Sequence, residues 1–114
     1  MTMNQQDLVW VRLPFTSMEQ AKVRPAVVVS NNNYNKRYED IIVCAVTSKI
    51  SDAPYGIIIG QENLSSGRLP VRSRIKADKI MQIGKGLVIK PFARLDDKAF
   101  DLLLETVFTI LRRE

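Results

Sequence analysis

Short runs of β-forming residues, spaced closely along the chain and followed by one helical segment, constrain the fold more than any other feature. The runs cover residues 8–13, 26–30, 41–46, 55–59, 71–78 and 87–89, with polar or turn-forming residues between them. The second and third runs are almost continuously apolar, as in buried strands. Many short strands and one terminal helix predict a mainly β fold, a small and strongly bent barrel with a C-terminal helix.

The segments between these runs are expected to be connections without regular structure. They cover residues 14–23, 33–40, 51–54 and 60–67, and a tight turn is expected at residues 84–86. The first connection is polar and about ten residues long, which is long enough to suggest a functional loop.

The last segment has the pattern of an amphipathic helix. Asp96 is a candidate N-cap, and Asp97 supplies an acid for the first turn. Apolar residues follow at helical spacing at positions 100, 103, 104, 107, 108 and 111. Arg112 and Arg113 complement the helix dipole. Because so wide an apolar face exceeds what a small barrel covers, we expect part of it, or a neighbouring strand, to contact a second subunit.

Length and charge narrow the possibilities further. The chain has 114 residues, the size of a single domain over residues 1–114, with a formal net charge of +5 and a pI near 9.6. That charge suits a nucleic acid or an acidic protein as partner, although many proteins without such partners are equally basic. No segment resembles a signal peptide or a membrane span, so the cytoplasm is the expected compartment and no membrane partner is expected.

Histidine is absent and cysteine occurs once, at Cys44. The lack of histidine excludes the Ser-His-Asp triad, the Cys-His pair and RNA cleavage by paired histidines. A single cysteine allows neither an intrachain disulfide nor a cysteine-based zinc site, and its apolar surroundings predict a buried, inert thiol. Asp96 and Asp97 suit a helix cap better than a metal pair, so we expect a site with no metal and no cofactor.

Four segments are similar to segments of a known family, in the same order and with similar spacing. They cover residues 7–11 with 14–16 behind them, 23–31, 41–48 and, more weakly, 75–80. Together they resemble the MazF/PemK family of toxins over nearly the whole chain. Gln6 departs from the pattern, because the family usually has glycine before the aspartate of the first strand. This departure concerns the geometry of that turn and not the active site.

The resemblance implies a fold, an activity and partners. The family has an SH3-like barrel with added helices, forms homodimers and belongs to type II toxin–antitoxin systems, in which an acidic antitoxin covers the RNA groove with a disordered tail. Its members cut single-stranded RNA, including mRNA, within short sequence motifs and without metal, and so inhibit translation and growth. The 2′-hydroxyl attacks the adjacent phosphate and leaves a 2′,3′-cyclic phosphate and a 5′-hydroxyl.

The family's catalytic arginine and threonine correspond to Arg24 and Thr47. A guanidinium offers a planar, two-pronged donor to the phosphate oxygens as charge develops, so Arg24 is assigned to charge stabilisation and proton donation to the leaving 5′-oxygen. Thr47 is assigned to positioning and transition-state hydrogen bonding, because a hydroxyl is a poor base at neutral pH. Glu19 is a candidate for accepting the 2′-hydroxyl proton, and the identity of this base stays open. Without the family pattern, Arg24 would be interpreted as a surface arginine before a strand.

A wider set of residues is predicted to contact RNA. It consists of Phe15, Glu19, Lys22, Asn31, Ser48, Asp78 and Lys79. Phe15 either stacks on a base or closes the end of the barrel. Asp78 and Lys79 either contact RNA or form the solvated face of a strand. Trp10 is predicted to be a core residue and not a stacking platform.

Residues 71–78 alternate in character. Positions 71, 73, 75 and 77 are expected on one face, and Arg72, Arg74, Lys76 and Asp78 on the other. The basic face either neutralises RNA phosphates or forms a solvated or antitoxin-facing surface.

Two other classes of function compete with a nuclease. A non-catalytic RNA- or protein-binding barrel would need neither Arg24 nor Thr47, so their joint presence at family spacing argues against it. A gyrase poison of the CcdB kind shares the fold but targets a protein, and the nuclease pair is not expected there. RNA cleavage separates these three hypotheses.

Overall fold

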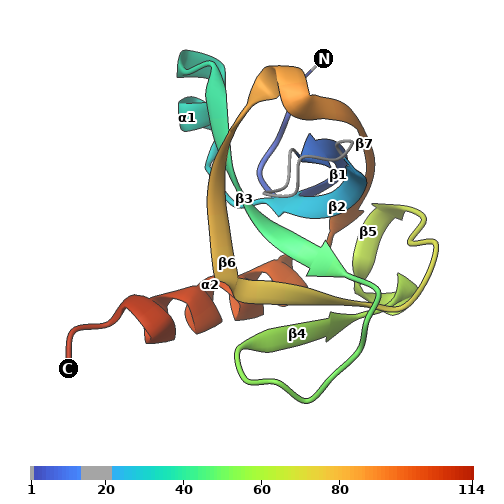
Figure 1. The fold of residues 1–114 in the computed structure, drawn as a ribbon, viewed down its shortest axis with the longest axis vertical. Coiled ribbons are helices and arrows are strands. Elements are labelled where there is room, and N and C mark those ends of the chain that lie inside the picture. The colour runs from blue at the N-terminus through green and yellow to red at the C-terminus, as the bar shows by residue number, and fades with distance from the viewer. Residues whose placement is uncertain (1, 14–21) are drawn as a thin grey trace.

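The computed structural model describes residues 2–13 and 22–114 (Figure 1). In chain order the elements are β1 (Asp7–Leu13), β2 (Lys22–Val28), α1 (Asn32–Arg37), β3 (Asp40–Thr47), β4 (Gly56–Ile59), the 3-10 turn η1 (Gln61–Asn63), β5 (Leu64–Gly67), β6 (Ser73–Gly84), the 3-10 turn η2 (Lys85–Leu87), β7 (Val88–Leu95) and α2 (Asp97–Leu111). The predicted barrel strands and terminal helix are all present.

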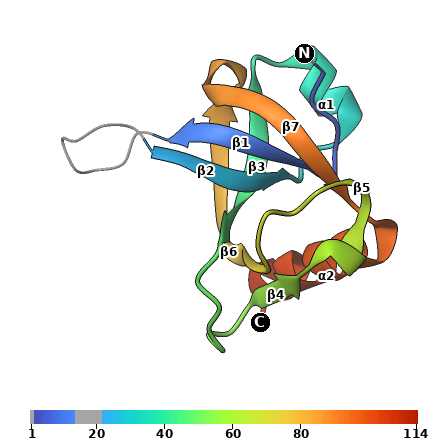
Figure 2. The same cartoon turned by 90° about the vertical axis from the view of Figure 1, so that its right-hand side faces the viewer.

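The strands form one antiparallel sheet in the order β4-β6-β3-β2-β1-β7-β5. This sheet curls strongly, α2 packs at one end of the molecule, and α1 lies at the other end (Figure 2). The mainly β fold with a small bent barrel and a C-terminal helix is therefore confirmed.

The long strand β6 causes much of the curl. Its second half pairs with β3 alone, and its first half lies between the end of β3 and β4. Between Cys44, which faces Ile80, and Val46, which faces Ile75, a single residue of β3 lies opposite residues 76–79 of β6. An irregularity of this kind bends a strand and changes the direction of its side chains. It turns β6 sharply and projects residues 76–79 beside the end of β3.

The core consists of two clusters that share β1, β2 and β3. One contains Val9, Val11, Ala26, Val28, Ile41, Val43, Ile83 and Val88. The other contains Leu8, Val27, Cys44, Ile59, Ile75, Phe100, Leu103 and Val107, and so joins the sheet to α2. Alternate residues of the three strands enter the two clusters, which explains their continuously apolar sequence.

The terminal helix begins as predicted. The Asp96 side chain caps it by accepting a 2.8 Å hydrogen bond from the backbone N–H of Ala99. Phe100, Leu103 and Val107 of the apolar stripe are buried. The rest of the stripe is not fully covered, since Phe108 is 62% exposed and Leu111 is 68% exposed.

Two predicted connections contain regular structure, and a third, residues 14–23, ends inside β2, which begins at Lys22; those expectations were wrong. Residues 32–37 form a six-residue helix, which begins where the Asn31 side chain accepts a 2.8 Å hydrogen bond from the N–H of Tyr34. Buried Asn35 fixes this helix by donating to the carbonyls of Met3 and Ser30. Residues 64–67 pair with β7 as strand β5, and β6 continues six residues beyond the predicted end at position 78.

The turn before β1 keeps a glycine-like geometry although it contains Gln6. Gln6 has a φ of 80°, in the left-handed region that favours glycine and costs other residues about 1–2 kcal/mol. Its side chain compensates by donating to the carbonyl of Leu95 at 3.0 Å and to Asp97 at 3.1 Å. Gln6 therefore adopts a backbone conformation that glycine would adopt without strain.

Candidate functional site

The candidate site lies where β3 separates from β2. The two strands pair only over Ala26–Val28 and Val43–Ala45. Before that region β2 pairs with β1 alone, and after it β3 pairs with β6. Arg24 is exposed on the first part of β2, and Thr47 is half-buried at the end of β3. The separation of the strands brings these two side chains to the same opening.

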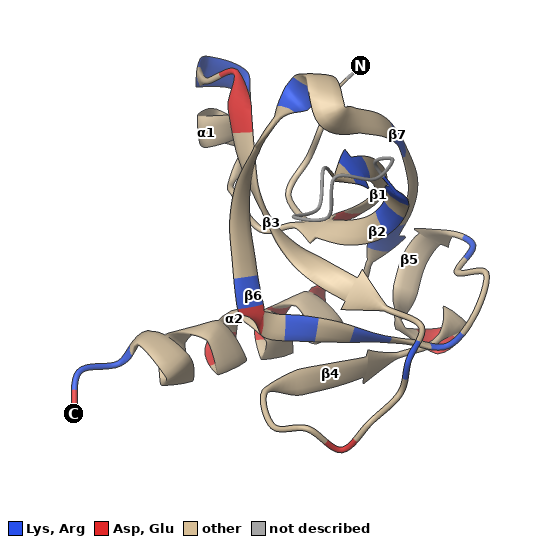
Figure 3. Ribbon diagram, in the orientation of Figure 1, with Lys and Arg blue, Asp and Glu red and all other residues tan. Residues whose placement is uncertain are grey.

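A pocket of about 230 Å³ fills this opening. Its lining residues are Leu13, Arg24, Pro25, Ala45, Val46, Thr47, Lys76 and Lys79. The two lysines come from the bent segment of β6, opposite Ala45. Figure 3 shows basic residues on β2 and along this part of β6. The pocket therefore combines one guanidinium, two ammonium groups and a hydroxyl, a set of groups that suits a phosphate.

A second pocket of about 200 Å³ adjoins the first and is mainly apolar. Its lining residues are Trp10, Val23, Arg24, Pro25, Val46, Thr47, Ser48, Leu69, Pro70, Val71, Ser73 and Phe92. The rings of Trp10 and Phe92 stack with centroids 4.4 Å apart. Arg24 and Thr47 line both pockets, so they separate a basic space from an apolar, aromatic one.

The hydroxyl of Thr47 is held by the chain that follows it. Its oxygen accepts a 3.1 Å hydrogen bond from the backbone N–H of Lys49. A hydroxyl can accept and donate at once, so Thr47 can still donate its hydrogen to another acceptor. This arrangement suits donation to a phosphate oxygen in the pocket.

The sequence model of the PemK-like, MazF-like toxins of type II toxin–antitoxin systems matches residues 4–111. The chain belongs to this toxin family. No curated protein sequence matches it. Among solved structures, the MazE–MazF complex of Deinococcus radiodurans in crystal form III is similar at 17% identity, with a TM-score of 0.82 and 100% of both chains covered.

Two mycobacterial structures are similar to this MazF-like chain. An endoribonuclease in complex with its cognate antitoxin has 17% identity and a TM-score of 0.79, with 96% of this chain and 95% of that chain covered. The Mycobacterium tuberculosis toxin MazF-mt6 has 13% identity and a TM-score of 0.76, with 95% of this chain and 98% of that chain covered. At these identities the likeness shows the fold.

The predicted RNA-contacting residues of this MazF-like chain divide into three groups. Ser48 and Lys79 line the pockets beside Arg24 and Thr47. Lys22 and Asp78 are exposed on the neighbouring β2 and β6. Asn31 lies beyond the other end of β2, where it caps α1 and lines a different hollow. Phe15 and Glu19 lie outside the described residues.

The basic face predicted for β6 was wrong for Arg74. This arginine is buried at 5% exposure, and its guanidinium donates to the carbonyls of Ala53 at 3.0 Å and Pro54 at 3.1 Å. It ties the chain that follows Thr47 to β6 instead of facing RNA. Arg72 is exposed and pairs with Glu62 at 3.4 Å.

Aromatic residues were the part of the site that sequence analysis missed. Trp10 is half-buried and lines the apolar pocket, so its assignment to the core was wrong. Its register on β1 opposite Pro25 of β2 and Lys90 of β7 brings it close to Phe92. This pairing joins strands that are distant in sequence, and no local pattern indicates it.

The single thiol takes no part in this site. Cys44 is buried, as predicted. Burial, reinforced by the charge of Asp78, raises the pKa of the Cys44 thiol to about 12, so the group stays protonated and unreactive.

Two further features of the described residues bear on function. Residues 2–13 and 22–114 contain no group of three histidine, cysteine or acidic side chains placed to hold a metal ion. Within the same residues, no helix is long and apolar enough to cross a membrane.

Proposed function

We propose that this chain is an endoribonuclease toxin that cuts single-stranded RNA in the cytoplasm without a metal ion. The observation that carries the proposal is the shared pocket of Arg24 and Thr47, flanked by Lys76 and Lys79. Family membership supports it, since a structural relative is itself an endoribonuclease bound to its cognate antitoxin.

The reaction develops negative charge on the phosphate, and the basic pocket matches that charge. As the 2′-hydroxyl attacks, Arg24 donates two hydrogen bonds to the phosphate oxygens, and Thr47 donates a third. Lys76 and Lys79 add positive charge at the same place. The bond to the 5′-oxygen breaks, Arg24 supplies the proton that this oxygen needs, and a 2′,3′-cyclic phosphate remains. Glu19 is the proposed acceptor of the 2′-hydroxyl proton.

The apolar pocket provides a place for a base beside the scissile phosphate. Trp10 and Phe92 offer an aromatic edge, and Leu69 and Pro70 offer apolar contacts. Bases of single-stranded RNA are commonly held on such surfaces. Ser48 at the rim can add a hydrogen bond to a base edge. This pocket is therefore the proposed source of the base preference next to the cut.

Two protein partners complete the proposal. An acidic antitoxin would neutralise the basic pocket, in line with the antitoxin-bound relatives. A second copy of the chain would cover the exposed apolar side chains of α2, which makes the active species a homodimer.

A cleavage gel tests the function directly. Purified protein is incubated with a mixed single-stranded RNA in excess EDTA, and cleavage is expected because no side-chain cluster of the described residues suits a metal. RNA that stays intact in EDTA and is cut after magnesium is added would exclude metal-independent chemistry. RNA that stays intact in both conditions, together with inhibition of gyrase, would favour the gyrase-poison hypothesis.

A further inference from the structure

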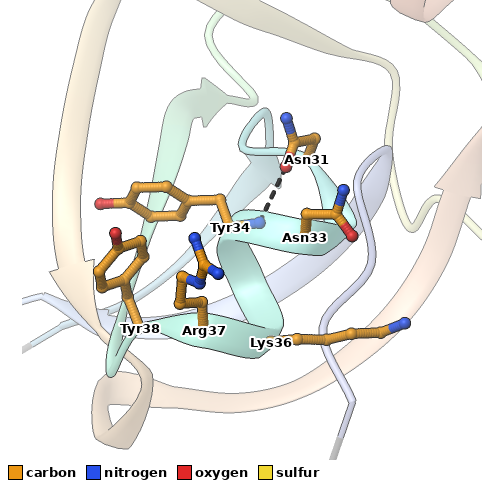
Figure 4. Close-up of a pocket in the computed structure, with 6 residues that line it drawn as sticks. All are labelled: Asn31, Asn33, Tyr34, Lys36, Arg37 and Tyr38. Carbon is orange, nitrogen blue, oxygen red and sulfur yellow. Dashed lines mark hydrogen bonds between the residues drawn. The ribbon is translucent and has the colours of Figure 1, made fainter.

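A second set of polar and aromatic side chains gathers around α1, at the end of β2 and β3 opposite the candidate site. Asn31, Asn33, Tyr34, Lys36, Arg37 and Tyr38 line an open hollow of about 720 Å³ there (Figure 4). We call these six residues the α1 patch. It shares no lining residue with the two pockets at Arg24 and Thr47.

The aromatic part of the α1 patch is exposed and held in place. The rings of Tyr34 and Tyr38 lie with centroids 4.8 Å apart at an interplanar angle of 46°. The side-chain amide of Gln82 donates a 3.0 Å hydrogen bond to the hydroxyl of Tyr34, which fixes that ring against β6. Tyr38 packs against the fixed ring and is still 50% exposed. Tyr34 thus supports Tyr38, and the Tyr38 ring forms a platform open to solvent.

The helix beneath the α1 patch is anchored through buried polar groups. The Asn35 amide donates to the carbonyl of Met3 at 3.2 Å and to that of Ser30 at 2.9 Å. The Ser30 hydroxyl donates to the Asn35 side-chain oxygen and accepts a 3.0 Å hydrogen bond from the N–H of Ile42. The patch therefore keeps its shape before any ligand arrives, which lowers the entropy cost of binding.

The charged part of the α1 patch is directed to solvent. Lys36 and Arg37 are exposed, and their side chains form no hydrogen bond or ion pair with other residues in the described part of the chain. Glu39 and Asp40 follow in sequence but do not line the hollow. Asn33 adds an exposed carboxamide. The patch thus offers two cations, a stacking surface and amide groups on one rigid face.

We propose that the α1 patch binds single-stranded RNA outside the cleaved segment, with a base stacked on Tyr38 and phosphates held by Lys36 and Arg37. Aromatic stacking combined with basic side chains is how proteins bind single strands with little sequence preference. An acidic protein would pair mainly with the two cations, whereas a single strand would use the cations, the open ring and the carboxamides together, through its phosphates, base faces and base edges. The choice of RNA as ligand rests on the proposed nuclease function.

The geometry sets a length requirement. Thr47 ends β3 and Asp40 begins it, so the two sites are separated by the length of this eight-residue strand, about 25 Å at the usual rise per residue. An RNA that covers only the cut site therefore cannot reach the α1 patch. Only a longer RNA can gain affinity from both sites.

Binding to two RNA lengths tests the proposal. Affinity is measured by fluorescence anisotropy in EDTA for RNAs of about 20 and about four nucleotides, each with the same cut site at its centre, with Thr47→Ala protein to prevent cleavage. Tyr38→Ala and Arg37→Ala, each added to that protein, should weaken binding of the long RNA about tenfold or more and leave the short RNA unaffected. Tyr38→Phe should bind like the parent, because it keeps the ring.

Matched controls separate this site from general electrostatics and from misfolding. Arg113→Ala removes another exposed arginine, just beyond the C-terminal end of α2, and should leave long-RNA affinity unchanged. Thermal melting checks that each variant is folded, and Arg37→Ala changes only an exposed side chain if Tyr38→Ala proves unstable.

The outcomes distinguish the α1 patch from the nuclease. Long-RNA affinity that is equal in the parent, Tyr38→Ala and Arg37→Ala would overturn the proposal even if the wild-type chain cleaves RNA. So would equal losses for both RNA lengths, or a loss with Tyr38→Phe as large as with Tyr38→Ala. If the wild-type chain cuts no RNA but long-RNA binding still depends on Tyr38 and Arg37, RNA binding by the α1 patch is supported and the nuclease assignment is wrong.

Discussion

Arg24 and Thr47 belong to strands that pair directly for only three residues, and their side chains line the same pocket just beyond that pairing. Each makes interactions that strengthen as charge develops on the phosphate, so each is expected to act on the rate more than on binding. Arg24→Ala and Thr47→Ala should each slow single-turnover cleavage of a defined RNA by about a hundredfold or more, near 3 kcal/mol. Arg24→Lys should also be slow, because an ammonium loses the two-pronged geometry.

Controls for this prediction come from the terminal helix region. Arg113 and Thr109 are exposed residues of the same types, distant in sequence from the pocket, and their alanine variants should cut at the wild-type rate. If the Arg24→Ala and Thr47→Ala proteins fold normally and also cut at the wild-type rate, these residues are not catalytic. The hypothesis of a non-catalytic RNA- or protein-binding barrel would then be favoured.

Arg74 and Arg72 lie two residues apart and have opposite environments. Arg74→Ala would remove a buried guanidinium and its hydrogen bonds to the carbonyls of Ala53 and Pro54, and since hydrogen bonds of a charged group contribute about 1.5–3 kcal/mol, the free energy of unfolding should fall by about that amount. Arg72→Ala breaks only an exposed ion pair with Glu62 and should cost about 0–1 kcal/mol. Urea unfolding of both variants measures the difference, and equal losses would show that Arg74 does not hold the loop after Thr47.

At the scale of elements, the sequence predicted those parts whose burial produces an apolar pattern. The strands β1, β2 and β3 and the helix α2 follow from continuous or periodic apolar residues. The helix α1 was missed because polar groups form it: Asn31 caps it and buried Asn35 anchors it. Neither the Asn31 cap nor the Asn35 anchor produces a periodic apolar pattern in the sequence.

Only part of the candidate site was predicted, and the physical reason is similar. The family pattern identified Arg24 and Thr47, but the bend of β6 that brings Lys76 and Lys79 beside them depends on pairing with β3 and β4. Alternation alone predicted that Arg74 faces solvent. Local sequence does not determine which side of a bent strand is covered by a loop.

The helix α2 is the element from which we predict dimerisation. Leu102, Phe108 and Leu111 are 50%, 62% and 68% exposed, and apolar side chains of this size favour contact with another subunit. Sedimentation at micromolar concentration should show a species of twice the 13.0 kDa chain mass. Phe108→Asp should shift it towards the monomer, because the substitution places a charge among these exposed apolar side chains. A 13.0 kDa species at all concentrations would refute the prediction.

At the scale of the whole molecule, the curled sheet separates three surfaces. The basic and apolar pockets lie where β2 and β3 diverge, the α1 patch lies at the opposite end of these strands, and the exposed face of α2 lies beneath the sheet. RNA binding at the α1 patch and cleavage at the pocket of Arg24 and Thr47 can therefore be changed separately by substitutions on different surfaces.

The central claim is that this chain cleaves RNA by attack of the 2′-hydroxyl at the pocket of Arg24 and Thr47. The most direct measurement compares an RNA containing a mapped cut site with the same oligonucleotide carrying a 2′-deoxy group at the attacking position, both in excess EDTA. The RNA should be cut to a 2′,3′-cyclic phosphate and a 5′-hydroxyl, and the deoxy-substituted strand should stay intact at that position. Cleavage of the deoxy-substituted strand at the wild-type rate, or products with a 5′-phosphate, would contradict the claim.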